Sequence, residues 1–241
     1  MKYIILSDIH SNLQAFEAAI KSFPKEKGIP IISAGDVVGY GANPNECIEM
    51  VQSLKAVNIL GNHDAAVIDR TDISYFNAHA RDAVLWTKEN IGQSALDYLQ
   101  GLPLVLEEKL FTVVHGTLHD PEEFNYMMDW TDAMRTLEIL KTNICFVGHS
   151  HVPDVFISAG GKLFRSHEKK VKIEDGSRYI INVGSIGQPR DNDSRACYCV
   201  YDSEKKEVEF HRVEYDVRSA HDSIIEAGLP VMLAERILVG R

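Results

Sequence analysis

The stretch Tyr3-Ile4-Ile5-Leu6-Ser7-Asp8-Ile9-His10 begins as an apolar run and ends in an aspartate and a histidine. The apolar run predicts a buried strand, and Asn12 stands where it would cap the helix that follows. An aspartate and a histidine two residues apart, at the carboxyl end of a strand, can both direct their side chains into one cleft. One such segment is weak evidence, because many strands end in aspartate.

The same arrangement, an apolar run closed by polar side chains, recurs four more times. The closing segments are Gly35-Asp36, Gly61-Asn62-His63-Asp64, His115-Gly116 and Gly148-His149-Ser150-His151. Taken singly, a Gly-Asp pair is usually a turn, and a histidine after an apolar run is usually a structural residue. The carboxyl ends of strands are where α/β folds place their sites. Five such segments together therefore favour one shared site over five coincidences.

Strands and helices alternate in the first third of the chain. Apolar runs at residues 29–34 and 57–60 predict two more strands, and Asn43-Pro44 marks the start of the helix between them. This rhythm is typical of βαβ units with a largely parallel sheet, which places the chain in the α/β class. Two helices are expected between about residues 77 and 100, where they would cap one end of the cleft.

The second half of the chain is rich in short strands, and its hairpin signals predict many antiparallel pairs. Strands are predicted at residues 104–106, 110–114, 144–147 and 155–157. The turn at Ala159–Lys162 predicts a hairpin, Asp175-Gly176 is the strongest hairpin signal in the chain, and residues 196–213 predict a third hairpin. A helix near residues 132–141 lies among these strands, and the tail from about residue 218 is helical.

Length and composition bound the class of protein. The 241 residues are enough for one sizeable core and no linker or repeat divides them, so we expect a single domain over residues 1–241. Lys and Arg number 25 and Asp and Glu 35, which gives a net charge of −10. A negative field opposes binding to nucleic acid or to an anionic membrane. It does not oppose an anionic small-molecule substrate where bound cations dominate the local field.

The four cysteines predict buried thiols in a reducing compartment. They are Cys47, Cys145, Cys197 and Cys199, and none of their spacings matches a zinc ribbon or finger. The sequence starts without the basic and apolar regions of a secretory leader, and no apolar run is long enough for a membrane span. These features predict a cytoplasmic protein.

The polar side chains of the five segments share a ligand chemistry. They are Asp8, His10, Asp36, Asn62, His63, His115, His149 and His151. Such an oxygen and nitrogen set, without thiolate, suits divalent Mn, Fe, Zn, Ni or Co. Seven such ligands exceed what one tetrahedral zinc needs, whereas two five- or six-coordinate ions that share a carboxylate could use all of them.

In their order and approximate spacing, these five segments resemble the five-motif signature of calcineurin-like metallophosphoesterases. The motifs run from residue 8 to residue 151, and the later hairpins fit the second sheet of that family, so the resemblance covers most of the chain. It implies a four-layer α/β fold in which two mixed β-sheets pack as a sandwich flanked by α-helices. It also implies a dinuclear metal site at one edge of the sandwich.

The resemblance implies a role for each residue of the site. The residues implied to hold the first metal ion are Asp8, His10 and His151. Those implied to hold the second metal ion are Asn62, His115 and His149. Asp36 would bridge the two ions. His63 would protonate the leaving oxygen or stabilise the transition state, and Asp64 would orient His63.

The chemistry that follows from this arrangement is hydrolysis of a phosphoester. Two cations close together lower the pKa of a bridging water, so that hydroxide exists near neutral pH. They also bind two phosphoryl oxygens and neutralise the charge that develops in line with the attack. A neighbouring imidazolium, here that of His63, would give the leaving oxygen its proton.

Two residues of this chain differ from those of one branch of the family that it resembles, and they disfavour that branch. Ser/Thr protein phosphatases and symmetrical dinucleoside tetraphosphatases resemble one another in an arginine that follows the Gly-Asp motif, where this chain has Tyr40. A phenol cannot clamp a phosphate bidentately as a guanidinium does. The chain also has Asp64 where those phosphatases have glutamate. The segments Gly39-Tyr40-Gly41 and 184–190 look more like the small bacterial and archaeal phosphodiesterase-type members.

Two residues outside the motifs are candidate substrate contacts. Arg190 follows a glycine-rich loop that would let its guanidinium reach the cleft and bind a phosphate. The alternative for Arg190 is an exposed ion pair with Asp191 or Asp193. Asn12 lies close behind the first motif, where it would either touch substrate or cap the helix.

The leading interpretation is a hydrolase of small phosphodiesters or nucleotides. The motifs do not separate it from a phosphomonoesterase or a nucleotide pyrophosphatase. A non-catalytic interaction scaffold on the same fold is the alternative from a different class, although such relatives usually lack a ligand or the catalytic histidine. A nuclease is disfavoured by the acidic composition. The apolar content of the later hairpins permits a homodimer without requiring one.

Overall fold

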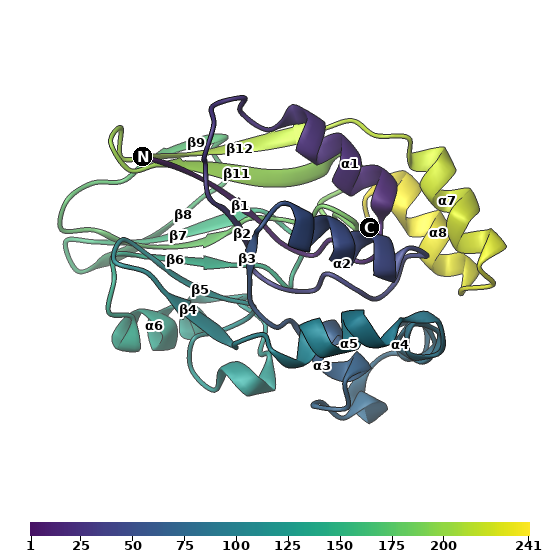
Figure 1. Ribbon diagram of the computed structural model, residues 1–241. Coiled ribbons are helices and arrows are strands. Elements are labelled where there is room, and N and C mark those ends of the chain that lie inside the picture. Colours follow the sequence, from purple (N-terminus) through teal and green to yellow (C-terminus); the bar gives the residue numbers. More distant parts are fainter.

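The first strand, β1 (Lys2–Leu6), lies inside a sheet and carries apolar side chains on both of its faces. The structure is a computed structural model that describes residues 1–241 (Figure 1). Ile4 and Leu6 pack on one side of β1 and Ile5 on the other, as the two-residue period of a strand requires. Such two-sided burial is typical of a strand that is covered on both faces.

The first sheet has six strands in the order β3-β2-β1-β11-β12-β9. The strands added to β1 are β2 (Ile31–Ser33), β3 (Val57–Asn58), β9 (Lys170–Lys172), β11 (Ala196–Asp202) and β12 (Glu207–Val213). β1, β2 and β3 run parallel, whereas β11 is antiparallel to β1, β12 to β11 and β9 to β12. The predicted parallel beginning and the hairpin over residues 196–213 are both confirmed.

The second sheet also has six strands, in the order β4-β5-β6-β10-β7-β8. Its strands are β4 (Val105–Glu107), β5 (Thr112–Val114), β6 (Ile144–Val147), β7 (Asp154–Ala159), β8 (Lys162–Ser166) and β10 (Arg178–Asn182). β5, β6 and β10 run parallel, and the outer strands are antiparallel to their neighbours. Both sheets are therefore mixed, and the predicted hairpin at Ala159–Lys162 is confirmed as the β7–β8 turn.

Helices cover the outer face of each sheet. These helices are α1 (Leu13–Ser22), α2 (Pro44–Ser53) and α6 (Trp130–Ile139). α1 and α2 pack on the first sheet, where Phe16 and Val51 join the same buried cluster as Tyr198 of β11. α6 packs on the second sheet, where Leu137 joins the cluster that contains Val147. In Figure 1 the two sheets lie between these helices as the middle layers of the molecule.

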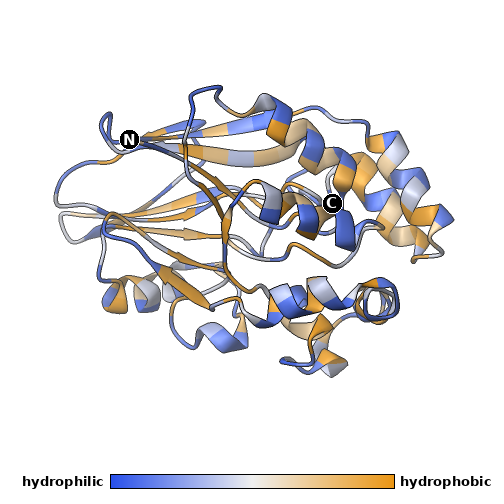
Figure 2. Cartoon of the chain, in the orientation of Figure 1, coloured by the Kyte–Doolittle hydropathy of each residue, from blue (hydrophilic) through white to orange (hydrophobic).

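A separate core fills the space between the sheets. Ile5 and Cys199 of the first sheet share one buried cluster with Phe146 and Ile181 of the second. Figure 2 shows the strands predominantly in the hydrophobic colour, whereas the helices alternate between hydrophobic and hydrophilic residues. The predicted four-layer α/β fold, two mixed sheets packed as a sandwich and flanked by α-helices, is confirmed.

The remaining helices gather at the end of the sandwich where the parallel strands finish (Figure 1). They are α3 (Asn62–Val67), α4 (Ala78–Asn90), α5 (Gln93–Gln100), α7 (Val217–Glu226) and α8 (Val231–Val239), with two short 3-10 turns, η1 (Ile73–Tyr75) and η2 (Pro121–Glu123). The two helices expected between residues 77 and 100 and the helical tail are confirmed, whereas α3 was not predicted. None of the helices has the length and apolar character needed to cross a membrane.

The prediction of a hairpin at Asp175-Gly176 is wrong. A turn does occur there, and Gly176 has the positive φ of +79° that such a turn needs. The strands on its two sides are β9 and β10, which belong to different sheets. The chain therefore crosses from one layer of the sandwich to the other at this turn, because β9 pairs with β12 and β10 pairs with β6 and β7.

Candidate metal centre

The polar side chains that close the five apolar runs meet at one edge of the sandwich. They follow β1, β2, β3, β5 and β6, the parallel strands whose carboxyl ends point to that edge. Three groups of ligating atoms lie close enough together to hold an ion. The groups are Asp8 with His10 and His151, Asp36 with His115 and His149, and His10 with Asp36 and His63.

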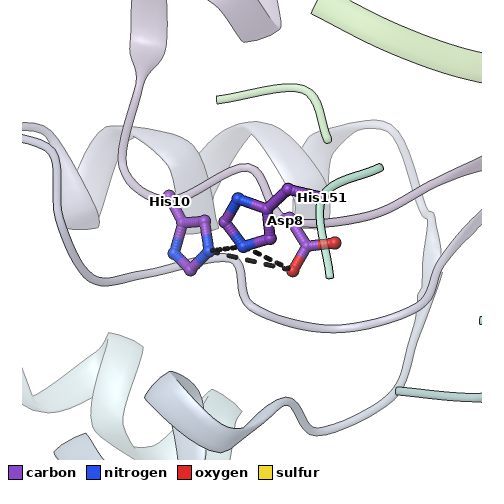
Figure 3. A group of neighbouring side chains, drawn as sticks. All are labelled: Asp8, His10 and His151. Atoms are coloured by element: carbon purple, nitrogen blue, oxygen red, sulfur yellow. Dashed lines mark hydrogen bonds and ion pairs between the residues drawn. The ribbon is translucent and has the colours of Figure 1, made fainter. Parts of the chain in front are cut away.

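Asp8, His10 and His151 form the first group (Figure 3). The Nε2 atoms of His10 and His151 are 3.0 Å apart, and they lie 3.7 Å and 3.4 Å from Asp8 Oδ1. Each ring donates its Nδ1 proton to a backbone carbonyl, of Val38 for His10 and of Gln188 for His151. Both Nε2 atoms therefore carry lone pairs that face each other, an arrangement that a cation between them would stabilise.

Asp36, Asn62, His115 and His149 form the second group. His115 Nε2 lies 3.3 Å from Asp36 Oδ2 and 3.1 Å from Asn62 Oδ1, and the rings of His115 and His149 have centroids 4.8 Å apart. Burial lowers the pKa of His115, but the Asp36 carboxylate outweighs it and raises that pKa to about 9. In the chain alone, a proton on His115 thus occupies the place between Asp36 and Asn62.

Asp36 is shared between the two groups. Its Oδ2 lies 3.6 Å from His10 Nε2 and 3.3 Å from His115 Nε2, whereas its Oδ1 accepts the backbone N–H of His63 at 2.8 Å. Burial alone would raise the pKa of Asp36, but the His115 imidazolium holds it well below its usual range. A Cβ on Gly61 would lie 2.1 Å from Asp36 Oδ1, so only glycine permits this approach.

The residues present fit divalent metal ions. Asp8 Oδ1 and Asp36 Oδ2 are buried without any hydrogen-bond partner, a costly condition that a coordinated cation would relieve. Burial raises the pKa of Asp8 to about 7. Burial also lowers the pKa values of His10, His149 and His151 well below their usual range, so these rings are in the neutral form that binds metal.

A cavity of about 780 Å³ opens above the two groups. Site residues that line it include Asp36, Asn62, His63, His149, His151 and Arg190. Phe76, Phe124 and Tyr126 add aromatic surface from α3–α4 and from the segment before α6. A cavity of this volume is in the range of small-molecule sites, roughly 300–1,000 Å³.

His63 lies close to His10 and Asp36 and lines the cavity. Its ring packs against Tyr40 and Phe76, with centroid distances of 4.3 Å and 5.2 Å. Its Nδ1 is buried without a partner, so Nε2 is the atom left to face a ligand. Burial lowers the pKa of His63 to about 4, so the ring is neutral at neutral pH.

Asp64 makes no hydrogen bond to the His63 ring, so the orienting role that the resemblance implies would act through the backbone. Its two carboxylate oxygens accept the backbone N–H groups of Val38 and Gly61 at 3.1 Å and 3.2 Å. Burial raises the pKa of Asp64 to about 7. Asp64 therefore fixes the two loops that flank His63, and the aromatic neighbours Tyr40 and Phe76 hold the His63 ring itself.

Arg190 lies in the cavity and not in an exposed ion pair. Its guanidinium donates to Gln188 Oε1 at 2.8 Å and to the Tyr40 hydroxyl oxygen at 3.3 Å. The two aspartates that were the alternative partners of Arg190 form other ion pairs. Asp191 pairs with Arg212, and Asp193 pairs with Arg195. Arg190 thus enters the site beside Tyr40.

Asn12 does not line the cavity. Its Oδ1 accepts the N–H of Ala15 at 3.0 Å, which makes it the cap of α1, and its Nδ2 donates to the Gly187 carbonyl at 2.8 Å. Both ends of the amide are occupied, so the structure gives the capping role and no path to substrate.

Two residues of the site, Gln188 and Tyr126, are not among the site residues predicted from the sequence. Gln188 fixes both His151, through its carbonyl, and Arg190, through its side chain. Tyr126 stacks on His149 from a segment with no strand or helix periodicity. Gln188 stands next to Pro189-Arg190 in a glycine-rich loop, which is the one local hint; Tyr126 has none, because only the fold brings its loop to His149.

Comparisons with known proteins agree with this fold. Residues 1–206 match the family described as the calcineurin-like phosphoesterase superfamily domain. An uncharacterized protein of Methanocaldococcus jannaschii is 40% identical over 243 residues, covering 98% of this chain and 97% of that protein. The crystal structure of a metallophosphoesterase from Sphaerobacter thermophilus is similar at a TM-score of 0.88 and 36% identity, covering 100% of this chain and 99% of that chain. A hypothetical protein from Pyrococcus horikoshii OT3 shares the fold at a TM-score of 0.80 and 21% identity, covering 100% of this chain and 98% of that chain.

Proposed function

The chain belongs to the calcineurin-like phosphoesterase superfamily, and from that premise we propose that it is a metal-dependent hydrolase of small phosphodiesters or nucleotides. One observation carries the proposal. Two buried carboxylate oxygens, Asp8 Oδ1 and Asp36 Oδ2, have no hydrogen-bond partner and face the Nε2 atoms of His10, His115 and His151 at the base of a cavity. Buried carboxylate oxygens without partners, beside several imidazole nitrogens, are the chemistry of a cation site.

Two divalent ions would be held by seven side chains. The first ion would take Asp8, His10 and His151, the second would take Asn62, His115 and His149, and Asp36 would be shared. When bound, such ions supply Lewis-acid activation of water and neutralise charge on the phosphoryl group. The ligand set suits Mn, Fe, Zn, Ni or Co, so Mn²⁺ is a suitable first probe.

Arg190 would bind a non-bridging phosphoryl oxygen of the substrate. Gln188 and Tyr40 hold two of its nitrogens, and its Nη1 has no partner within the protein. A guanidinium held in this way has lost its side-chain freedom before substrate arrives, which favours binding. The cavity extends well past a single phosphoryl group, so it has room for the ester groups of a diester or for a nucleotide.

His63 would act on the leaving oxygen through Nε2. The ring is neutral in the free protein because burial lowers its pKa to about 4, although the Asp36 carboxylate opposes this effect. A neutral ring can donate a hydrogen bond from Nε2–H to the oxygen on which charge develops. Full protonation of His63 requires the pKa to rise when an anionic substrate enters the cavity beside it.

The test of this function is hydrolysis by metal-stripped protein as Mn²⁺ is titrated in. The substrates are bis-p-nitrophenyl phosphate and p-nitrophenyl phosphate, and the variants are His63→Ala and His167→Ala. His167 is an exposed histidine outside the cavity, so it controls for the loss of an imidazole as such. We expect metal-dependent cleavage of the diester that His63→Ala loses and His167→Ala keeps.

The other outcomes identify the competing functions. Clear preference for the monoester would indicate a phosphomonoesterase. Tight metal binding without turnover of either ester, or of a nucleotide panel, would indicate an interaction scaffold on the same fold. A protein that binds no metal would overturn the proposal.

We also propose that the chain works as one domain in the cytoplasm. All four cysteines are free and buried, which suits a reducing compartment. Size-exclusion chromatography with light scattering decides between a monomer and the homodimer that the sequence permits.

A further inference from the structure

His149 differs from the other imidazoles of the site in how it is held. His10, His115 and His151 each donate from Nδ1 to a backbone carbonyl, at 3.0 Å, 2.7 Å and 2.6 Å. Such a bond fixes the ring plane and leaves Nε2 free as a ligand. His149 shares the cavity with His151 but lacks any such bond. Its side chain therefore needs another support to face Asp36 and His115.

Tyr126 supplies a contact of the right kind. Its ring stacks on that of His149 with a centroid distance of 3.8 Å and an angle of 21° between the planes. The ring of His115 is farther from that of His149, with a centroid distance of 4.8 Å and an angle of 55° between the planes. The imidazole of His149 is thus covered by one near-parallel aromatic face, which restricts rotation about its χ2 angle.

The segment that carries Tyr126 is anchored on both sides of it. Phe124 is buried with Leu60 at the end of β3, and Met127 is buried in the cluster under α6. A Cβ on Gly116 would lie 2.3 Å from the Asn125 carbonyl, so the segment packs directly on the turn after β5. Tyr126 itself is half exposed and lines the cavity. A residue held between two buried anchors can hold the position of the ring it covers.

We propose that Tyr126 is a positioning residue that sets the plane of His149 and thereby the affinity of the second metal ion. The inference rests on the proposed function, because it concerns the ion that Asn62, His115, His149 and Asp36 would hold. The aromatic ring is what matters, since the Tyr126 hydroxyl makes no hydrogen bond within the protein. Residues that orient a ligand typically change metal affinity by about 10- to 100-fold.

The experiment is calorimetric titration of metal-stripped protein with Mn²⁺, which reports the number of ions bound and the affinity of each. The variants are Tyr126→Ala, Tyr126→Phe and Tyr75→Ala. Tyr75 lines the same cavity and is 89% exposed, but it touches no ligand ring, so it is the matched control. We expect the wild type, Tyr126→Phe and Tyr75→Ala to bind two ions alike. Tyr126→Ala should bind one ion normally and the other at least tenfold more weakly.

Three results would overturn the inference while leaving the proposed function intact. These are unchanged binding of both ions by Tyr126→Ala, an equal loss at both sites, and the same loss in Tyr75→Ala. Circular dichroism and thermal unfolding of each variant show whether it is folded. If Tyr126→Ala does not fold, Tyr126→Leu covers His149 without an aromatic face and must show the same selective loss. A wild type that binds no Mn²⁺ would instead overturn the proposed function itself.

Discussion

Five residues of the site hold a backbone conformation that L-amino acids rarely adopt. Asp8, His10, Asp36, His149 and His151 have φ values between +50° and +66°. Aspartate and histidine tolerate this region better than most residues, but each instance still costs on the order of 1 kcal/mol. Hydrogen bonds between the loops stabilise it, among them Asp8 N–H to the Gly35 carbonyl and His10 N–H to the Asp36 carbonyl. The loops thus give up stability in order to direct side chains toward one point.

Gly39 limits where His63 can lie. Its φ is +92°, and a Cβ there would lie 2.5 Å from His63 Nδ1. We expect Gly39→Ala to displace the His63 ring and to lower kcat about 100-fold, since a shift of about 1 Å at a reacting group has that effect. Steady-state kinetics on the diester measures the loss.

Gly160→Ala is the control for Gly39→Ala. Gly160 also has a positive φ, +56°, but an added Cβ would meet nothing within 4 Å. This variant carries the backbone cost of about 1–2 kcal/mol without contact to the site. Equal loss of activity in the two variants would show that backbone strain, and not the position of His63, is responsible.

The ion pair of His115 with Asp36 predicts the pH dependence of stability in the metal-free protein. The pKa of His115 is about 9, above its usual value of 6.5, so the pair stabilises fully below pH 6.5 and loses its contribution as pH rises through 9. The free energy of unfolding should fall by up to about 3 kcal/mol between pH 7 and pH 10. Urea denaturation in EDTA measures it, and His115→Asn should lack the fall. Parallel curves for the two proteins would contradict the assignment.

At the scale of elements, the C-terminal helices α7 and α8 pack in the same buried cluster as Tyr40, which contacts the site. Tyr40 is buried in one cluster with Ala80 and Ala83 of α4 and Leu233 and Ile237 of α8. Its ring packs against the rings of both His10 and His63, with centroid distances of 4.6 Å and 4.3 Å. The C-terminal helices therefore hold Tyr40, and Tyr40 holds both His63 and Arg190.

Leu233→Ala tests this support. Leu233 is fully buried, so its truncation should cost about 2–5 kcal/mol of stability through lost contacts and a cavity. The neighbouring Met232 is 55% exposed, and Met232→Ala should stay within about 0.5 kcal/mol of the wild type. Urea denaturation gives both values. A similar small effect for both variants would mean that α8 contributes little to the packing around Tyr40.

Element prediction failed where pairing was not local. Asp175-Gly176 has the turn chemistry of a hairpin and does make a turn, but β9 finds its partner in β12, far along the chain. In contrast, β11 and β12 are joined by a short turn and pair as predicted, with the register Cys199 opposite Phe210. Turn residues report local backbone conformation, whereas the choice of sheet depends on which faces remain to be covered.

At the scale of the whole molecule, the first and the second group of ligands each span both sheets. Asp8 and His10 follow β1 of the first sheet, whereas His151 follows β6 of the second. In the other group, Asp36 follows β2 of the first sheet and His115 follows β5 of the second. An ion bound in either group would cross-link the two halves of the sandwich.

Metal binding should therefore raise the thermal stability of the protein. At about 100 times the Kd, each bound ion adds about 2.7 kcal/mol, which is several degrees in Tm for a chain of this size. The stripped protein should remain folded, because the core between the sheets lies apart from the ligands. Thermal scans with Mn²⁺, with EDTA and with KCl of equal ionic strength measure the shift. Asp36→Asn should lose most of it, and an equal shift in that variant would contradict the shared role of Asp36.

The sequence by itself determined the kinds of side chain at the site and the strand ends that deliver them. Strand periodicity and ligand chemistry are local properties, and they were enough to place Asp8, His10 and Asp36 at strand ends as candidate ligands. Only the tertiary structure decided that Asp64 binds backbone instead of His63, that Asn12 serves as a cap, and that Tyr126 covers His149. These contacts join segments remote in sequence, and packing of the two sheets fixes them.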